Sequence, residues 1–264
     1  MQPTLLVLTD FSAAAGQALA HAARLAEAIG GQLVLLHVQR QPLPGSALAD
    51  LTEEAARRAL DALLADLPVP ATAELAQGDV LPAVLAALSH HQPDLVVLGR
   101  PGPGAHPEAL ASTTAVQLLQ HALCPMLVVP PTGPEAAAPR RLLLAADGDG
   151  FSLGSCTGLM RHLLTALPAH LTVLHCSPYI KPGDGPLRSV LQTGLTAGLA
   201  PPRTIQVINM NPVEGIQSAA RPADYDALVM LARRRSRVSS LFHRSLTVRV
   251  MLSCPLPVLV LPAQ

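Results

Sequence analysis

The chain repeats itself at a distance of half its length, and this repeat constrains the fold more than any other feature. The run Leu5–Asp10 returns as Leu142–Asp147, and the run Pro125–Pro130 returns as Pro257–Pro262 at the end of the chain. Solenoid proteins repeat every 20–50 residues or so, a much shorter period. A period this long therefore indicates two copies of one domain.

The length fits this interpretation, since 264 residues make two domains of ordinary size. We expect the first domain over residues 1–132 and the second over 139–264, with a linker rich in Pro and Ala between them. Half of the residues are hydrophobic but only 2% are aromatic, so the cores must consist of Leu, Val and Ala. The 18 Lys and Arg balance 18 Asp and Glu, and stacking side chains are scarce, so we do not expect nucleic acid as a partner.

Location and redox state follow from what the sequence lacks. The N-terminal residues do not resemble a secretory signal, and no apolar run approaches the ~20 residues of a membrane span. The four cysteines form no Cys-x-x-Cys pair, a pattern typical of reduced thiols in an intracellular protein. We therefore expect a cytoplasmic protein with no membrane association and no metal site.

Short apolar runs alternate with helical patterns in both halves. In the first half the predicted strands are Leu5–Leu8, Leu33–Val38, Ala71–Leu75, Leu95–Leu98 and Met126–Val129. Single helices between strands require parallel crossovers, which predicts a doubly wound, Rossmann-like α/β sheet in each half. The second half repeats this order, although residues 177–202 are rich in Gly and Pro and give a poor helix signal.

Residues suited to bind an anion follow the fourth predicted strand. The turn Gly99–Gly102 contains two glycines, which allow a close approach of backbone to a ligand, and Ser112–Thr114 opens the next helix. A helix N-terminus offers free N–H groups to a phosphate, and the hydroxyls there can cap the helix or bind the phosphate. Asp10 ends the first strand at the same edge of the sheet, where it can accept hydrogen bonds from a ribose or a base.

These segments resemble the universal stress protein family. The runs Val7–Ser12, Leu33–Val38 and His121–Pro130 and the pair Gly78-Asp79 match its strands and turns, and the turn after the fourth strand matches its phosphate loop, G-x2-G-x9-G-[S/T]. The match covers most of residues 3–130, and the second half resembles the same domain more faintly, as in tandem members. The resemblance implies two adenine-nucleotide-hydrolase-like domains packed as a pseudo-dimer through their last strands, Met126–Val129 and Val258–Leu261.

The resemblance also implies a ligand, ATP, with or without Mg²⁺, in the first domain. The residues that it assigns to binding are Asp10, Val38, Gly99, Gly102, Ser112, Thr113 and Thr114. The third glycine of the family pattern is here Ser112, and loop prolines remove N–H donors. Because no Lys or Arg occurs between Pro101 and Pro139, Arg100 is the cation expected to offset phosphate charge.

The corresponding loop of the second half departs further from the family pattern. Asp147 keeps the acid of the first strand, but we align Ala232 and Arg235 with the two glycines. A bulky residue at the second position predicts that the second domain does not bind ATP in the family manner. The loop is either a solvated surface or a patch that receives an anion or an acidic partner. The arginines of that patch are Arg233, Arg234, Arg235 and Arg237.

Three functional hypotheses follow, and none assigns a catalytic residue. The first is a stress protein that binds ATP in its first domain and acts as a regulatory module toward an unknown protein partner, as an intrachain pseudo-dimer or a homodimer of such chains. The second is a stress adaptor that acts by protein contact without a nucleotide. The third, a slow ATPase, lacks a recognisable general base.

Overall fold

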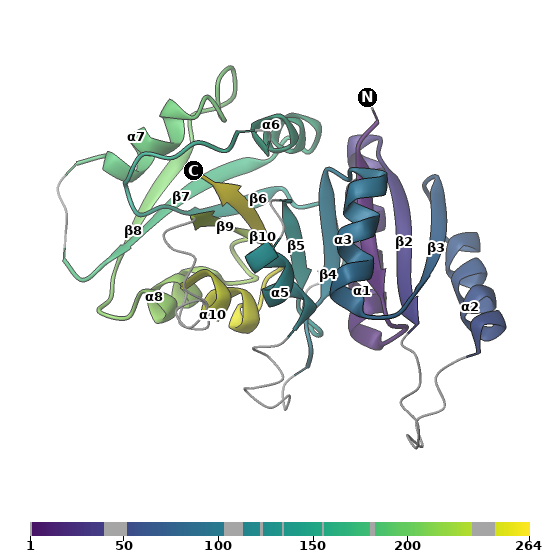
Figure 1. Ribbon diagram of the computed structural model, residues 1–264. Helices are drawn as coiled ribbons and strands as arrows, with labels where there is room; N and C mark the ends of the chain where they lie inside the picture. Colours follow the sequence, from purple (N-terminus) through teal and green to yellow (C-terminus); the bar gives the residue numbers. More distant parts are fainter. Residues whose placement is uncertain are drawn as a thin grey trace.

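The computed structural model describes residues 2–39, 52–102, 113–121, 124–133, 135–154, 156–179, 183–233 and 246–264. Its strands form one continuous ten-stranded sheet in the order β3-β2-β1-β4-β5-β10-β9-β6-β7-β8 (Figure 1). No helix in the described ranges is long and apolar enough to cross a membrane.

Each half contributes five strands and the helices that connect them. The N-terminal half contains β1 (Thr4–Thr9), α1 (Ala13–Ile29), β2 (Gln32–Gln39), α2 (Glu53–Ala65), β3 (Ala71–Gln77), α3 (Val80–His91), β4 (Leu95–Gly99), α5 (Thr114–His121) and β5 (Met126–Val129). The C-terminal half contains β6 (Arg141–Ala145), α6 (Cys156–Ala166), β7 (His170–Ser177), α7 (Gly185–Gln192), β8 (Arg203–Ile208), α8 (Pro212–Ala219), β9 (Ala227–Arg233), α10 (Leu246–Ser253) and β10 (Val258–Ala263). Within each half neighbouring strands are parallel and follow the same order, which confirms the predicted pair of doubly wound α/β units.

The two halves join through their last strands, as predicted. β5 and β10 pair antiparallel, with Leu127 opposite Leu259, and this pairing makes the two five-stranded sheets one (Figure 1). A second contact links α1 and α6, where His162 Nε2 lies 3.0 Å from the carbonyl oxygen of Ile29. Each half thereby covers an edge strand of the other that would otherwise expose unpaired backbone groups.

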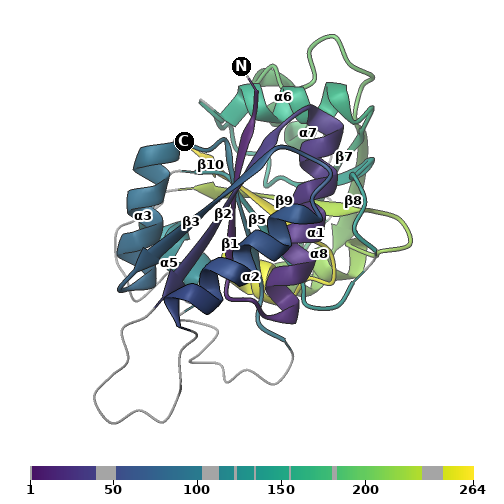
Figure 2. The same ribbon diagram turned by 90° about the vertical axis from the view of Figure 1, so that its right-hand side faces the viewer.

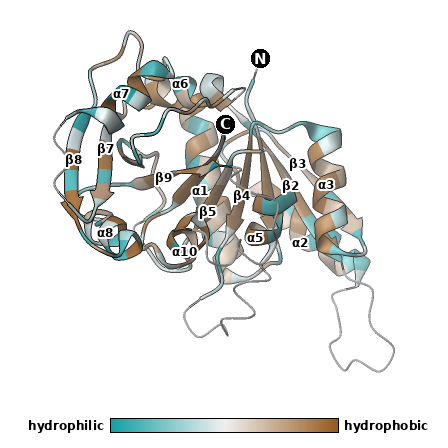
Figure 3. Ribbon diagram, turned by 60° about the vertical axis from the view of Figure 1, so that its left-hand side comes forward, coloured by the Kyte–Doolittle hydropathy of each residue, from teal (hydrophilic) through white to brown (hydrophobic). Residues whose placement is uncertain are grey.

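The buried residues form two clusters, one on each face of the sheet. Helices α1, α2, α6 and α7 cover one face, and α3, α5, α8 and α10 cover the other. Figure 2 shows α1 and α2 on the opposite side of the N-terminal strands from α3 and α5. The central strands are apolar on both faces, as Figure 3 shows by colour, because Leu5 and Val7 enter the first cluster while Leu6 enters the second.

Helix α1 begins and ends where the sequence places its signals. Ser12 caps the N-terminus, since its hydroxyl oxygen accepts a hydrogen bond from Ala15 N at 3.2 Å. Gly30 ends the helix in the left-handed region, with φ of 65°. The Ser12 cap places the first turn of α1 at the carboxyl end of β1.

Two aspartates hold equivalent positions in the two halves, at the edge of the sheet where β4 and β9 begin. Asp94, just before β4, accepts a hydrogen bond from Thr4 N at 2.9 Å. Asp226, just before β9, accepts from the backbone N–H groups of Arg140 and Arg141 at 2.8 and 2.9 Å and from the Arg141 guanidinium at 2.6 and 3.0 Å. Partial burial alone would raise the pKa of Asp226, but these hydrogen bonds outweigh it and lower the pKa below the ordinary value.

Asp226→Asn is therefore expected to lower the melting temperature near neutral pH by about 2–4 °C, a modest loss because the pair is half-exposed. A lowered carboxyl pKa stabilises the fold above the unfolded value of about 3.9, and this stabilisation is lost as the pH falls through the folded value. Calorimetric melts of wild type and Asp226→Asn should therefore begin to converge below about pH 4 and should coincide once the pH lies below the folded pKa of Asp226. An equal deficit at acid and neutral pH would contradict this assignment, and Asp61→Asn, on the exposed face of α2, serves as the control.

Candidate functional site

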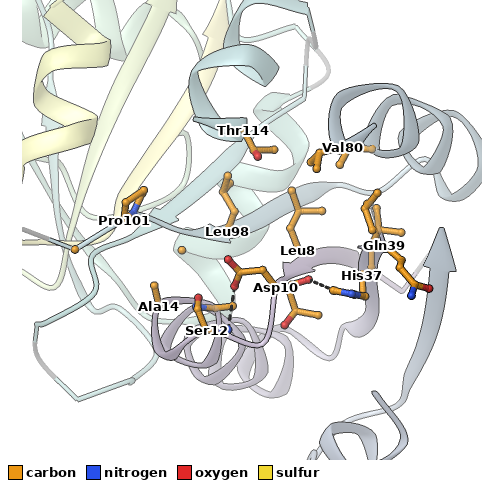
Figure 4. Close-up of a pocket in the computed structure, with 17 residues that line it drawn as sticks. Leu8, Asp10, Ser12, Ala14, His37, Gln39, Val80, Leu98, Pro101 and Thr114 are labelled. Carbon is orange, nitrogen blue, oxygen red and sulfur yellow. Dashed lines mark hydrogen bonds between the residues drawn. The ribbon is translucent and has the colours of Figure 1, made fainter. Parts of the chain in front are cut away.

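A cavity of about 650 Å³ opens at the carboxyl edge of the N-terminal half. It lies between the ends of β1, β2 and β4 and the first turns of α1, α3 and α5 (Figure 4). Its volume is that of a typical small-molecule site, and its position is where doubly wound sheets bind ligands. The lining residues are Leu8, Thr9, Asp10, Ser12, Ala14, Ala15, Leu36, His37, Val38, Gln39, Val80, Val84, Leu98, Gly99, Pro101, Gly102 and Thr114.

The cavity brings together most of the residues assigned from the family pattern. Those that line it are Asp10, Val38, Gly99, Gly102 and Thr114. Thr113 does not line it, and its Oγ1 lies 3.4 Å from Val116 N, at the start of α5, as in a helix cap. Ser112 lies outside the described residues.

Asp10 is fixed by the turn that connects β1 to α1. Its Oδ1 accepts a hydrogen bond from Ser12 N at 3.0 Å, and Phe11 adopts a positive φ of 61°. Within the part of the chain that the structure describes, Asp10 Oδ2 has no hydrogen-bond partner, and Asp10 is exposed to the cavity. The carboxylate is thus held in place by one oxygen, and the other can accept from a ligand hydroxyl.

The two glycines of the turn after β4 have different physical roles. A Cβ on Gly99 would lie 2.4 Å from the carbonyl oxygen of Ala14 and 2.6 Å from its carbonyl carbon. A Cβ on Gly102 would meet no atom within 4 Å. Gly99 is therefore required for the packing of β4 against α1, whereas the space beside Gly102 is open to a ligand.

Sequence reasoning missed the apolar wall of the cavity. Leu8, Leu36 and Leu98 lie in the carboxyl-terminal halves of β1, β2 and β4, and Val80 and Val84 come from the first two turns of α3. A signal was available for Leu8 and Leu98, because the last apolar residue of a predicted strand must lie near the carboxyl edge. Such a wall suits the flat apolar faces of a base.

His37 also lines the cavity, and its ring is oriented by two contacts. Nδ1 lies 2.8 Å from the carbonyl oxygen of Thr9, and the ring packs on Phe11 with the centroids 4.4 Å apart. A carbonyl oxygen only accepts hydrogen bonds, so Nδ1 carries the proton. The C-terminal half repeats this arrangement, since His175 Nδ1 lies 3.1 Å from the carbonyl oxygen of Ala146.

The expectation that Arg100 offsets phosphate charge is wrong. Arg100 does not line the cavity, and its Nη1 is buried with no hydrogen-bond partner among the described residues. Burial lowers the pKa of the Arg100 guanidinium, and the thiol of Cys254, which follows α10, acts in the opposite direction. The guanidinium of Arg100 is thus partly buried and lies outside the lining of the cavity.

In the C-terminal half an arginine contacts the counterpart of Asp10. Arg233 Nη2 lies 2.8 Å from Asp147 Oδ1 and 2.8 Å from the carbonyl oxygen of Asp149, and the guanidinium lies 5.7 Å from the ring centroid of Phe151. Only 16% of its side chain is exposed. Asp147, the counterpart of Asp10, is therefore paired within the chain.

The strand register corrects the alignment of the two loops. Gly99 pairs with Val129, just before Pro130, and Leu231 pairs with Leu261, just before Pro262. Leu231, rather than Ala232, thus takes the place of Gly99, and Arg233 takes the place of the cavity residue Pro101. Arg234, Arg235 and Arg237 of the arginine patch lie outside the described residues. Counted on from Leu231, the counterpart of Gly102 is Arg234 and not Arg235, and the block that we expected at this position stays a prediction.

The fold and the cavity define a tandem, doubly wound α/β protein with an open cavity at the carboxyl edge of its first half. The family model described as the universal stress protein family matches residues 1–130 and again residues 139–262. The chain belongs to the universal stress protein family and carries two copies of its domain. No curated protein matches the chain.

Two solved structures that cover nearly the whole chain share this fold at low sequence identity. A universal stress protein from Archaeoglobus fulgidus is 16% identical, with a TM-score of 0.72 over 98% of this chain and 96% of that chain. A protein of unknown function from Pseudomonas aeruginosa is 17% identical, with a TM-score of 0.60 over 99% and 92% of the two chains. A universal stress protein family protein from Arabidopsis thaliana with AMP bound is 18% identical, with a TM-score of 0.35 over 48% and 91%.

Proposed function

We propose that the first domain binds an adenine nucleotide in the cavity at its carboxyl edge and that the bound nucleotide regulates contacts with a protein partner. ATP is the nucleotide that the family pattern implies. One observation carries the proposal: a single open cavity is lined by Asp10, Val38, Gly99, Gly102 and Thr114, which come from four separate segments of the chain. The second domain has a structural or interaction role, since Arg233 occupies its site.

The cavity offers each part of a nucleotide a suitable surface. The aliphatic wall from β1, β2, β4 and α3 suits the base, and Asp10 suits the ribose hydroxyls. The first turns of α1 and α5 present backbone N–H groups to a phosphate. A nucleotide would thus bridge the two helix-covered faces of the sheet.

Asp10→Asn tests the proposal with adenosine, which carries no charge. Asparagine keeps an oxygen that accepts from Ser12 N, so the turn is retained while the charged acceptor is lost. We expect the affinity for adenosine, measured by isothermal titration calorimetry, to fall about tenfold.

Asp61→Asn, which removes a carboxylate from the exposed face of α2, is the control and should leave the affinity unchanged. Absence of heat with adenosine, AMP and ATP–Mg²⁺ alike at high micromolar concentration would refute nucleotide binding. Equal affinities of wild type and Asp10→Asn would place the ligand elsewhere.

The adaptor hypothesis has one observation in its favour. At the outer end of the C-terminal half, Tyr179, Ile208 and Met210 are 69%, 57% and 78% exposed. Exposed apolar side chains near one another are typical of surfaces that bind proteins. Absence of nucleotide binding in the titration above would favour this second function.

A further inference from the structure

We propose that the cavity of the first domain binds the two hydroxyls of a ribose with a pair of hydrogen-bond acceptors, Asp10 Oδ2 and His37 Nε2, and so selects ribonucleosides over deoxyribonucleosides. This inference rests on the proposed nucleotide site and concerns the sugar that the site accepts. It gives a ligand contact to His37, which is not among the residues that the family pattern assigns to binding.

His37 offers the cavity an acceptor. Its Nδ1 lies 2.8 Å from the carbonyl oxygen of Thr9, an atom that only accepts, so Nδ1 carries the proton and Nε2 carries the lone pair of the neutral ring. Among the residues that the structure describes, none forms a hydrogen bond with Nε2. The side chain lines the cavity, is half-buried and packs on Phe11, so its position is set before a ligand binds.

Asp10 offers a second acceptor at the end of the neighbouring strand. Its Oδ1 accepts from Ser12 N at 3.0 Å, which leaves Oδ2 for a ligand. Thr9 pairs in register with His37, so Asp10 lies one residue beyond the partner of His37, and Figure 4 shows Asp10 and His37 at neighbouring strand ends. Neighbouring strands are about 4.8 Å apart, a separation that one sugar ring spans.

The ribose is the part of a nucleotide that matches two acceptors. Ionised phosphate oxygens accept hydrogen bonds and are repelled by the carboxylate of Asp10. Adenine donates from a single amino group, whereas the 2′ and 3′ hydroxyls are two separate donors on neighbouring carbon atoms. A sugar that lacks one of these hydroxyls leaves one acceptor without its partner, which costs affinity.

The C-terminal half shows that the orientation of the histidine ring belongs to the fold. His175 Nδ1 makes the same contact, 3.1 Å from the carbonyl oxygen of Ala146. His175 is only 7% exposed, however, and its Nε2 is buried with no hydrogen-bond partner in the part of the chain that the structure describes. Asp147, the counterpart of Asp10, is bound to Arg233. The second half thus has the same two residues but does not offer them to a ligand as a pair.

The test compares adenosine with 2′-deoxyadenosine and 3′-deoxyadenosine on the full chain by isothermal titration calorimetry. The titrations are made at about pH 8, above the range in which an imidazole ordinarily gains its proton. We expect the loss of either hydroxyl to reduce the affinity about fivefold or more. Deoxy analogues that bind as tightly as adenosine would overturn the inference while the proposed function stands. Failure of adenosine, AMP and ATP alike to bind would refute the proposed function itself.

His37→Asn separates the contribution of His37 from that of the rest of the cavity. The asparagine amide keeps an N–H donor for the carbonyl oxygen of Thr9, but it is too short to place an acceptor where Nε2 lies. In this variant one of the two deoxy analogues should bind within about twofold of adenosine, because its missing hydroxyl no longer has a partner to lose. Wild-type deficits for both analogues in His37→Asn would overturn the role of His37.

His121→Asn is the matched control. His121 Nδ1 also lies 2.8 Å from a backbone carbonyl oxygen, that of Gln117, but His121 is exposed and does not line the cavity. Both analogues should keep their wild-type deficits in this variant, and a change as large as in His37→Asn would contradict the assignment. Thermal melts show whether each variant is folded, and the wild-type comparison decides the selectivity by itself should His37→Asn fail to fold.

Discussion

Gly99→Ala is expected to destabilise the protein by about 3 kcal/mol, a large effect for one added methyl group. The new Cβ would lie 2.4 and 2.6 Å from the carbonyl oxygen and carbon of Ala14, which are backbone atoms in the first turn of α1. Relief of this clash requires α1 to move away from β4, and buried residues such as Ala18 and Ala22 resist that movement. Urea denaturation at neutral pH measures the loss, and the turn that carries Asp10 should be displaced with α1.

Gly102→Ala is the matched control, three residues along the same turn. Its Cβ would meet no atom within 4 Å, and its φ is outside the left-handed region, so its stability should remain within about 0.5 kcal/mol of wild type. Gly99→Ala and Gly102→Ala with equal stability would mean that β4 and α1 do not pack as described.

Arg233→Ala is expected to destabilise the C-terminal half by about 2 kcal/mol. The guanidinium is mostly buried, contacts Asp147 and the carbonyl of Asp149, and lies over Phe151, so its removal leaves a polar cavity. The loss falls below the 3–5 kcal/mol or so of a fully buried pair because the carboxylates of Asp147 and Asp149 are 48% and 68% exposed. Urea denaturation, monitored by circular dichroism, measures it.

Arg24→Ala serves as the control for Arg233→Ala. Arg24 pairs with Glu27 on the exposed side of α1, with half of each side chain in solvent, so its removal should cost less than about 0.5 kcal/mol. A similarly small loss in Arg233→Ala would show that Arg233 does not fill the second site.

Most of the fold could be predicted because strong local signals coincide with its central elements. The apolar runs around Leu6, Val34 and Val96 are buried on both faces, and Ser12 and Gly30 bound the longest helix. Helices α7, α8 and α10 were not located from the sequence, because each has eight residues, like α5, but lacks the run of Ser and Thr that marks the start of α5. α7 and α8 also begin with Pro or Gly-Pro, which the sequence reading takes for loop.

The position of the candidate site could be predicted from the sequence, but the contacts that its charged side chains make could not. Asp10, Val38 and Gly99 lie near the ends of parallel strands, so they meet at the carboxyl edge of the sheet regardless of their side-chain conformations. The burial of the Arg100 guanidinium and the contact of Arg233 with Asp147 depend on segments that lie far apart in the sequence. Such long-range contacts leave no periodic signal in the sequence, and a shift of one residue in the loop alignment was enough to assign the wrong arginine.

The stoichiometry of AMP binding tests the central claim most directly, namely one open nucleotide site in the first domain and a filled one in the second. Calorimetry on the full chain should give one AMP per chain, with the heat strongly reduced in Asp10→Asn. Two AMP per chain, or one whose binding is insensitive to Asp10→Asn, would contradict the account.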